Sequence, residues 1–195
     1  MREGLAMLMV TAAVAVPASA CGAASVAGPG AGATSAAPSS APTLPPRPRE
    51  IDLTGVDACT LLTPQQQRQL GTDRAPVASG ETDRYGNPYC HYSKALSSPY
   101  FGYTLQVVTQ EDATLYLTGE RDVTARVVSV AGFPAVENHR PLDERGCFVD
   151  VSTKDGQYLD VQYAESTGSN DPTEVACEKA RSAAELAMQT LLTQR

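Results

Sequence analysis

The chain has 195 residues, enough for one domain of ordinary size together with accessory segments. Its formal net charge is −7, and no two residues of the Lys and Arg types are adjacent. Because nonspecific binding to nucleic acid depends on clustered Lys and Arg, this composition argues against a nucleic-acid partner. It also argues against electrostatic attachment to anionic lipids, so attachment to a membrane has to be covalent or hydrophobic.

Residues 1–20 have the pattern of a secretory signal peptide. Residues 5–16 are almost all apolar, a run shorter than a membrane-spanning helix needs, and residues 18–20 present small side chains before Cys21. The ordinary signal peptidase and the lipoprotein signal peptidase would both cleave before Cys21. The lipobox departs from the usual pattern at Ala18, where Leu is common.

The cysteine count favours a lipid on Cys21. The chain has five cysteines, and an odd number leaves one thiol unpaired in an oxidising compartment. We therefore expect an acyl anchor on Cys21 that holds the exported protein on the outer side of the cell membrane; the alternative is secretion with Cys21 as the mature N-terminus. The spacing of the remaining four cysteines is not that of metal ligands. These cysteines predict two disulfides, with reduced buried thiols as the alternative. They are Cys59, Cys90, Cys147 and Cys177.

Residues 21–49 predict a lipidated N-terminus followed by a disordered tether. Residues 22–49 are mostly Gly, Ala, Ser, Thr and Pro, and they contain no acidic residue. Such a segment buries too little apolar surface to offset the entropy lost on ordering. We expect the folded domain to cover residues 50–195.

Capping residues predict the first helix. Thr63 can act as its N-cap, with Pro64 at the first position and Gln66 closing a capping box, and Gly71 ends it. Residues 57–62 are predicted to form a short helical turn before this helix.

The second predicted helix begins at Asp171-Pro172 and runs to about Leu192. Glu174 supplies an acidic residue in its first turn. Its apolar stripe is mostly alanine, which predicts close packing against a sheet. The stripe consists of Ala176, Ala180, Ala183, Ala187 and Leu191.

The strongest strand pattern covers residues 147–163 and predicts a hairpin. A two-residue loop would mix its apolar and polar faces, whereas a three-residue loop over 154–156 pairs Val151 with Leu159. That loop also places Gly156 where a left-handed backbone is required. Further strands are predicted at residues 89–93, 103–110, 127–130 and 135–137, with a helix over 111–121.

The order of these elements predicts an α+β domain. We expect an antiparallel β-sheet with helices packed on one face, including the N-terminal and C-terminal helices. Four cysteines allow three pairings. The expected pair Cys59–Cys177 joins the two terminal helices, and Cys90–Cys147 joins two strands.

Several short motifs, taken in order, resemble one known family. They are residues 57–63, Cys90-His91-Tyr92, residues 132–135, Cys147 with its Val-rich strand, and Cys177-Glu178. Together they resemble DUF3558, a family of uncharacterised actinobacterial lipoproteins, over about residues 50–192. The resemblance implies a lipoprotein with paired cysteines, and it implies no activity.

The sequence contains no catalytic, cofactor or metal motif. His91 and His139 are far apart, and no nucleophile elbow, calcium loop or phosphate-binding glycine loop accompanies them. Acidic residues at 111–112, 120–122 and 143–144 are predicted to be solvated. We expect no cofactor and no bound metal.

One aromatic-rich segment predicts a binding surface. Tyr combines an apolar ring with a hydrogen-bonding hydroxyl, which suits an interface, although the same residues could fill the core. The candidate residues are Tyr85, Tyr89, Tyr92, Tyr100, Phe101 and Tyr103.

These observations predict a cell-envelope lipoprotein with a non-catalytic binding or accessory domain displayed outside the membrane. Its partner would be a protein, a lipid or a wall component. A hydrolase-like enzyme with an unrecognised site is the alternative, and a purely structural or immune-exposed surface protein is the third.

Overall fold

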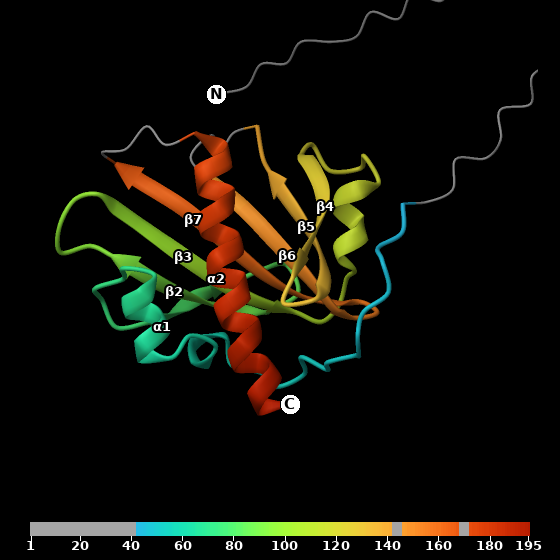
Figure 1. The fold of residues 1–195 in the computed structure, drawn as a ribbon, viewed down its shortest axis with the longest axis horizontal. Helices are drawn as coiled ribbons and strands as arrows, with labels where there is room; N and C mark the ends of the chain where they lie inside the picture. Colours follow the sequence, from blue (N-terminus) through green and yellow to red (C-terminus); the bar gives the residue numbers. More distant parts are fainter. Residues whose placement is uncertain (1–41, 142–145, 168–171) are drawn as a thin grey trace, which may run out of the picture. The chain divides into compact units, whose positions relative to one another are not determined.

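The fold is a seven-stranded antiparallel sheet with one main helix. The computed structural model describes residues 42–141, 146–167 and 172–195 (Figure 1). The predicted signal peptide, the lipidation site Cys21 and the helix cap Asp171 lie outside these residues. The strand order is β1-β2-β3-β7-β6-β5-β4, with every neighbouring pair antiparallel. The strands are β1 (Val77–Thr82), β2 (Pro88–Lys94), β3 (Tyr100–Val108), β4 (Thr124–Val130), β5 (Phe133–His139), β6 (Gly146–Lys154) and β7 (Gln157–Thr167).

The hairpin β6–β7 has the predicted register at the centre of the sheet. Val151 pairs with Leu159, and Gly156 has the predicted left-handed φ of 71°. The predicted three-residue loop is wrong in detail, because Lys154 still pairs with Gln157. The pairing shifts between Ser152 and Lys154, so the extra residue sits in β6 as an irregularity and the face alternation is kept.

Strand β1 was not predicted from the sequence. Its residues Val77–Thr82 are almost all exposed, and β1 pairs with one neighbour through an irregular register. A polar edge strand of this kind carries no two-residue periodicity, so its formation depends on β2 beside it.

The main helix is α2 (Thr173–Gln194), which crosses the sheet (Figure 1). All five residues of the predicted alanine-rich stripe lie on the buried side of this helix, and each is at most 2% exposed. Short alanine side chains let the helix lie close to β6 and β7. The first helix, α1 (Pro64–Gln69), has the predicted capping box between Thr63 and Gln66, but it is only six residues long. It follows the 3₁₀ turn η1 (Ala58–Thr60).

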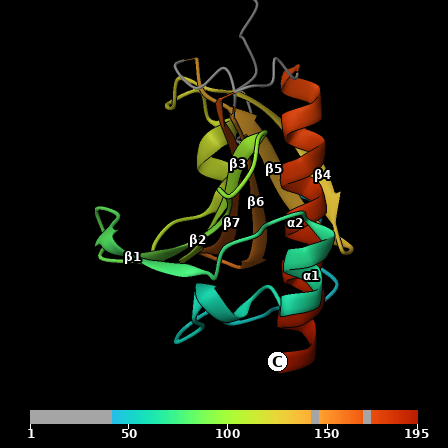
Figure 2. The ribbon, with the colours of Figure 1, turned by 90° about the vertical axis from the view of Figure 1, so that its left-hand side faces the viewer.

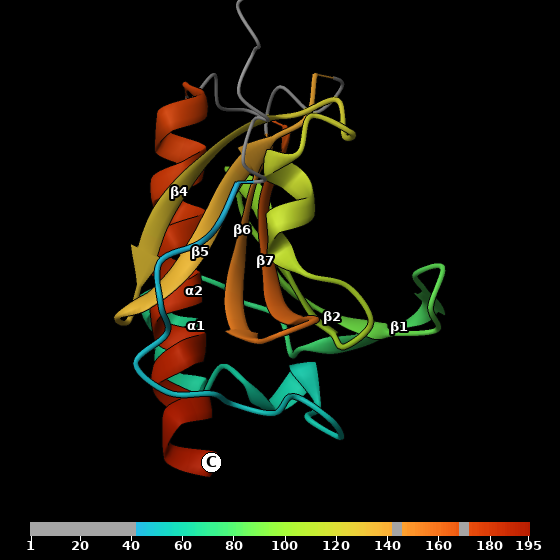
Figure 3. The same ribbon diagram turned by 90° about the vertical axis from the view of Figure 1, so that its right-hand side faces the viewer.

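The predicted fold class placed all helices on one face of the sheet. In the structure, the helical elements lie on both faces. Residues predicted as a helix over 111–121 form the 3₁₀ helix η2 (Ala113–Leu117). Figures 2 and 3 show the sheet edge-on, with α2 on one side and η2 on the other. Tyr116 of η2 packs with Val136 and Tyr158 in a small apolar cluster, separate from the main core under α2. The sheet therefore has an α2 face and an η2 face.

Both disulfides form, but their predicted pairing is wrong. The bonds are Cys59–Cys90 and Cys147–Cys177. The expected Cys90–Cys147 bond is excluded because β3 and β7 lie between β2 and β6, which places those strands about 14 Å apart. A disulfide requires Cα atoms within about 7 Å of one another. Each bond instead joins a helical element to the strand beneath it.

The folded part begins before residue 50. Leu44 packs against the apolar cluster of the η2 face, and the Arg47 guanidinium donates to Ser152 Oγ at 2.9 Å and pairs with Asp155. Ile51 N donates to Thr153 O at 2.8 Å. Composition alone predicted a tether as far as residue 49. The contacts of Leu44 and Arg47, together with hydrogen bonds from the Arg49 guanidinium to backbone carbonyls at the end of α2, attach the end of this segment to the domain.

Candidate functional site

The structure divides the predicted aromatic surface among several places. Tyr92 and Tyr103 are core residues, 0% and 3% exposed, and the Tyr92 hydroxyl donates to Ala58 O at 2.8 Å. Burial raises the pKa of Tyr92 to about 12. The two residues lie directly opposite each other on β2 and β3 and belong to the core under α2, so Tyr92 contributes no binding surface.

The other aromatic residues do not form one patch either. Phe101, together with Tyr103, lines a hollow of about 390 Å³ between α1, α2 and β3. The Tyr89 hydroxyl donates to Glu81 at 3.1 Å. Tyr100 and Tyr85 are both 40% exposed, but only Tyr85 lines a polar cavity.

That polar cavity lies on the η2 face and has a volume of about 290 Å³. It collects charged and aromatic side chains from the β1–β2 turn, β3, the η2 region, the end of β5 and β7. Its lining residues are Asp83, Arg84, Tyr85, Gln106, Val108, Glu111, Tyr116, Arg121, Arg140, Tyr158 and Asp160.

An acid pair forms the floor of the cavity. The β6–β7 register sets Asp150 directly opposite Asp160, and Gln106 of β3 continues the same row. Asp150 is 1% exposed, whereas Asp160 is partly exposed and lines the cavity. The Asn138 side-chain amide donates to Asp150 Oδ2 at 2.6 Å, which orients the inner carboxyl group.

Asp150 and Asp160 influence each other's ionisation. As two carboxylates, their facing Oδ1 atoms would have no donor between them, and like charges directly opposite each other destabilise a sheet. Burial, followed by the charge of Asp160, raises the pKa of Asp150 well above its usual value. Burial also raises the pKa of Asp160 to about 6, although the hydrogen bond from Asp150 and the charge of Arg140 oppose the increase. Of the two, Asp150 is therefore the group that holds a proton more strongly, and Asp160 is the carboxyl group that faces the cavity.

Glu111 organises the outer wall. Its Oε2 pairs with Arg84 and lies 3.4 Å from an Arg121 nitrogen, and it accepts a hydrogen bond from the Tyr85 hydroxyl at 3.1 Å. Its Oε1 accepts from the Tyr158 hydroxyl at 2.9 Å. The sequence had predicted a solvated Glu111; it instead ties the β1–β2 turn to η2 and β7.

Arg140 lies at the end of β5 with its guanidinium 3.8 Å from the centre of the Phe148 ring. It makes no hydrogen bond or close ion pair with another described residue, although its charge acts on Asp150 and Asp160. Its donors are therefore available to a molecule in the cavity.

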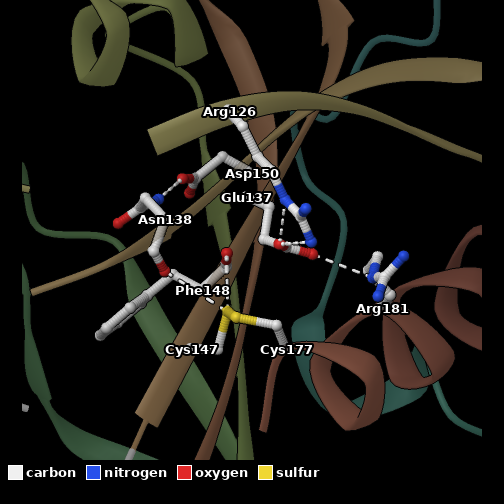
Figure 4. The surroundings of a disulfide bond; sticks show 8 residues. All are labelled: Arg126, Glu137, Asn138, Cys147, Phe148, Asp150, Cys177 and Arg181. Carbon is white, nitrogen blue, oxygen red and sulfur yellow. Dashed lines mark hydrogen bonds and ion pairs between the residues drawn. A yellow bond between two sulfur atoms is a disulfide. The ribbon is translucent and has the colours of Figure 1, made fainter. Parts of the chain in front are cut away.

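A second cavity, of about 320 Å³, lies on the α2 face beside the Cys147–Cys177 bond (Figure 4). Glu137, 4% exposed, lies between two arginines: its Oε1 is 2.6 Å from Arg126 and its Oε2 is 2.9 Å from Arg181. Because both carboxylate oxygens already have a basic partner, Glu137 ties β4 and α2 to β5. It has no unpaired charge to offer a ligand.

The same view contains a trio that resembles a metal site by distance. Glu137, Cys147 and Cys177 place their ligand atoms within 4.8 Å of one another. Sulfur in a disulfide is not a thiolate, so the trio cannot hold a metal while the bond is intact. Cys147 Sγ lies 3.5 Å from the Asn138 carbonyl oxygen, a van der Waals contact (Figure 4).

Residues 16–190 match the model of a family described as a protein of unknown function, DUF3558. The chain belongs to the DUF3558 family. The family has no described function, so this membership brings no catalytic residue to the chain. Comparison with curated proteins and with solved structures found no match.

Sequence reasoning missed most of the polar cavity in this DUF3558 member. Only Tyr85 was among the predicted site residues. The signal for Asp150 and Asp160 was nevertheless present, because pairing Val151 with Leu159 also places these two aspartates opposite each other. Glu111, Arg121 and Arg140 come from the segments that flank η2 and β5, and no local pattern brings them together.

Proposed function

We propose that this DUF3558 protein is a cell-envelope lipoprotein, anchored outside the membrane through Cys21, whose domain binds a small ligand in the polar cavity. The domain acts as a binding or accessory module and not as a catalyst. The observation that carries the proposal is the convergence on one cavity of Asp160 with Asp150 buried behind it, an arginine without a close partner in the described chain and three tyrosines.

Two features support export. The two disulfides are compatible with an exported protein, because such bonds persist in oxidising compartments. The first 20 residues have the signal-peptide pattern, and Cys21 follows the cleavage motif. Within the described residues, no helix has the length and apolarity needed to cross a membrane.

Binding is favoured over hydrolysis by the side chains in the cavity. The residues that line it include no Ser, Thr, Cys, Lys or His, so the described chain presents no hydroxyl, thiol or amine nucleophile there other than tyrosine. Burial raises the pKa of Tyr158 and of Tyr116 above the usual value, so both hydroxyls stay protonated.

A hydrolase-like enzyme is the second candidate, and the acid pair is the observation that favours it. A neutral and an ionised carboxyl group side by side can act as general acid and general base. Asp150 lies behind Asp160, however, so only one carboxyl group reaches the cavity. Ligand recovered unchanged after incubation with the protein supports binding, and turnover that Asp160→Asn abolishes would establish the enzyme.

The anchor is tested by intact-mass measurement on protein extracted from membranes. We expect a mature chain that begins at Cys21 and carries acyl chains, and a Cys21→Ser variant that appears in the culture medium. An unmodified Cys21 on protein recovered from the medium would show that the chain is secreted without an anchor.

The cavity is tested by photocrosslinking in living cells. A photoreactive phenylalanine analogue replaces Tyr85, which lines the cavity, or Tyr100, which is equally exposed at 40% but lies outside it. We expect a discrete adduct, identified by mass spectrometry, at position 85 only. Equal labelling at both positions, or none at position 85, would contradict a ligand site in this cavity.

A further inference from the structure

We propose that the polar cavity takes a small zwitterion of the amino-acid class, with its ammonium group on Asp160 and its carboxylate on Arg140. This inference rests on the proposed function, because it specifies the ligand of the same cavity.

The charges in the cavity wall balance. Three acids and three bases line it: Asp83, Glu111 and Asp160 against Arg84, Arg121 and Arg140. Asp150 is buried behind Asp160 and does not line the cavity, so the formal charges of the wall sum to zero. A ligand with no net charge therefore leaves the cavity balanced, whereas an ion of either sign does not.

Most of these charges already have partners. Glu111 pairs with Arg84 and Arg121. Asp83 accepts two hydrogen bonds from Asn87, one from the backbone and one from the side chain, both at 2.9 Å. These groups define the outer wall and its shape, and a ligand that bound to them would have to break existing contacts.

Two opposite charges remain. Asp160 accepts a hydrogen bond from Asp150 but has no basic group of the described chain in direct contact, and one of its oxygens is fully buried. Arg140 contacts the Phe148 ring and makes no hydrogen bond or close ion pair with the described residues. Their charges influence each other within the cavity without a direct ion pair. A ligand that gives donors to the carboxylate and acceptors to the guanidinium satisfies both.

The volume and the tyrosines limit the size of this ligand. At about 290 Å³ the cavity is at the lower end of the range for small-molecule sites, which favours a compound of few heavy atoms. The rings of Tyr116 and Tyr158 stand edge to face with centroids 6.2 Å apart, beside the acid pair. Aromatic rings next to a carboxylate are a favourable surface for an ammonium group. An α-amino acid has the required charges close together.

The protonation of the floor supports this orientation. Asp160, with its pKa raised to about 6, is ionised at neutral pH and can accept from an ammonium group. The groups facing it are Asp150 from β6, Arg140 after β5, Tyr116 from η2 and the Tyr158–Glu111 pair.

The experiment is calorimetric titration of the full acylated protein, purified from membranes in detergent. The probes are glycine, L-alanine and D-alanine, each compared with its methyl ester and its N-acetyl form. We expect at least one free amino acid to bind, and both of its modified forms to bind at least tenfold more weakly. The ester removes the charge that Arg140 recognises, and acetylation removes the charge that Asp160 recognises.

Two variants test the contact with the carboxylate and the contact with the ammonium group separately. Arg140→Gln should lose the preference for the acid over the ester, and Asp160→Asn should lose the preference for the free amine over the N-acetyl form. Asp122→Asn and Arg74→Gln, at exposed positions outside the cavity, serve as matched controls and should bind like the unmodified protein. Circular dichroism verifies that each variant is folded, and the comparison of ligand analogues on the unmodified protein does not depend on any variant.

The outcomes distinguish this inference from the proposed function. If no amino acid binds but photocrosslinking from position 85 still captures a cell-derived ligand, the ligand class is wrong and the binding function stands. If neither experiment finds a ligand, both proposals fail. Equal binding of an amino acid, its ester and its N-acetyl form would also overturn the assignment of the two charges.

Discussion

The two faces of the central hairpin differ although the same strands form them. On the α2 face, β6 and β7 present Val149, Val151, Leu159 and Val161, all 0% exposed beneath the helix. On the η2 face, the intervening positions include Asp160, which lines the polar cavity, and Asp150, which lies buried behind it. Period-two alternation therefore separates an apolar surface from a charged one within a single hairpin.

This difference indicates what each face does. The α2 face follows the rules for stability, with apolar contacts, a helix of small residues and a disulfide. The η2 face departs from them, because it holds two carboxyl groups together in a partly buried site. Departures of this kind are expected where a protein binds or reacts. Substitutions on the α2 face should therefore reduce stability, and substitutions on the η2 face should change the pH dependence of stability and the binding of a ligand.

The largest expected effect is removal of the Cys147–Cys177 disulfide. The bond closes a segment of sequence separation 30, so loop entropy predicts that Cys147→Ala with Cys177→Ala lowers the free energy of unfolding by about 3–4 kcal/mol. Urea unfolding followed by circular dichroism measures the loss.

The second disulfide provides the matched control. Cys59–Cys90 has a sequence separation of 31, so loop entropy predicts the same loss for Cys59→Ala with Cys90→Ala. Both bonds belong to the core under α2, so any difference between the two double variants measures the packing around each bond. A loss below about 1 kcal/mol at both sites would contradict the entropic account.

The next effect is on the pH dependence of stability. The pKa values of Asp150 and Asp160 are raised in the folded protein, so between about pH 4 and pH 6 the folded state holds a proton that the unfolded chain has released. Stability should therefore fall as pH rises through this window, by up to about 1.4 kcal/mol per pH unit for each such proton.

The double variant Asp150→Asn with Asp160→Asn should remove that slope. Asp52 and Asp73 have lowered pKa values, so their contribution is lost below pH 4 in both proteins and cancels in the comparison. Asp122→Asn, exposed and outside the cavity, should keep the slope. Urea unfolding at half-unit steps of pH measures the difference, and parallel curves for the double variant and the unmodified protein would show that the pair shares no proton.

Local signals in the sequence predicted more of the α2 face than of the η2 face. The stripe from Ala176 to Leu191 and the register of Val151 with Leu159 are periodic, and both were confirmed. The polar cavity depends on Glu111 and Arg140, which only the order of strands in the sheet brings together. No periodic pattern encodes that order, and the wrong disulfide pairing has the same cause.

The aromatic segment illustrates the limit at single residues. The sequence shows a cluster of tyrosines between positions 85 and 103, but it does not show which strand faces each ring occupies until register and strand order are known. Cys90 and Tyr92 share the α2 face, whereas Tyr89 and His91 alternate with them. The predicted surface therefore contains both core and exposed residues.

The smallest expected effect tests that division with two matched substitutions. Tyr92→Phe removes a buried hydroxyl and leaves the Ala58 carbonyl oxygen without that donor, so it should cost about 1 kcal/mol of unfolding free energy. Tyr100→Phe removes the same atom from a ring that is 40% exposed, and the change should stay within about 0.5 kcal/mol. Thermal and urea unfolding of both variants measure the two losses. Because the chemical change is identical, a larger loss for Tyr100→Phe would mean that the hydroxyl at position 100 is engaged in the folded protein, and that the aromatic segment contributes to an interface after all.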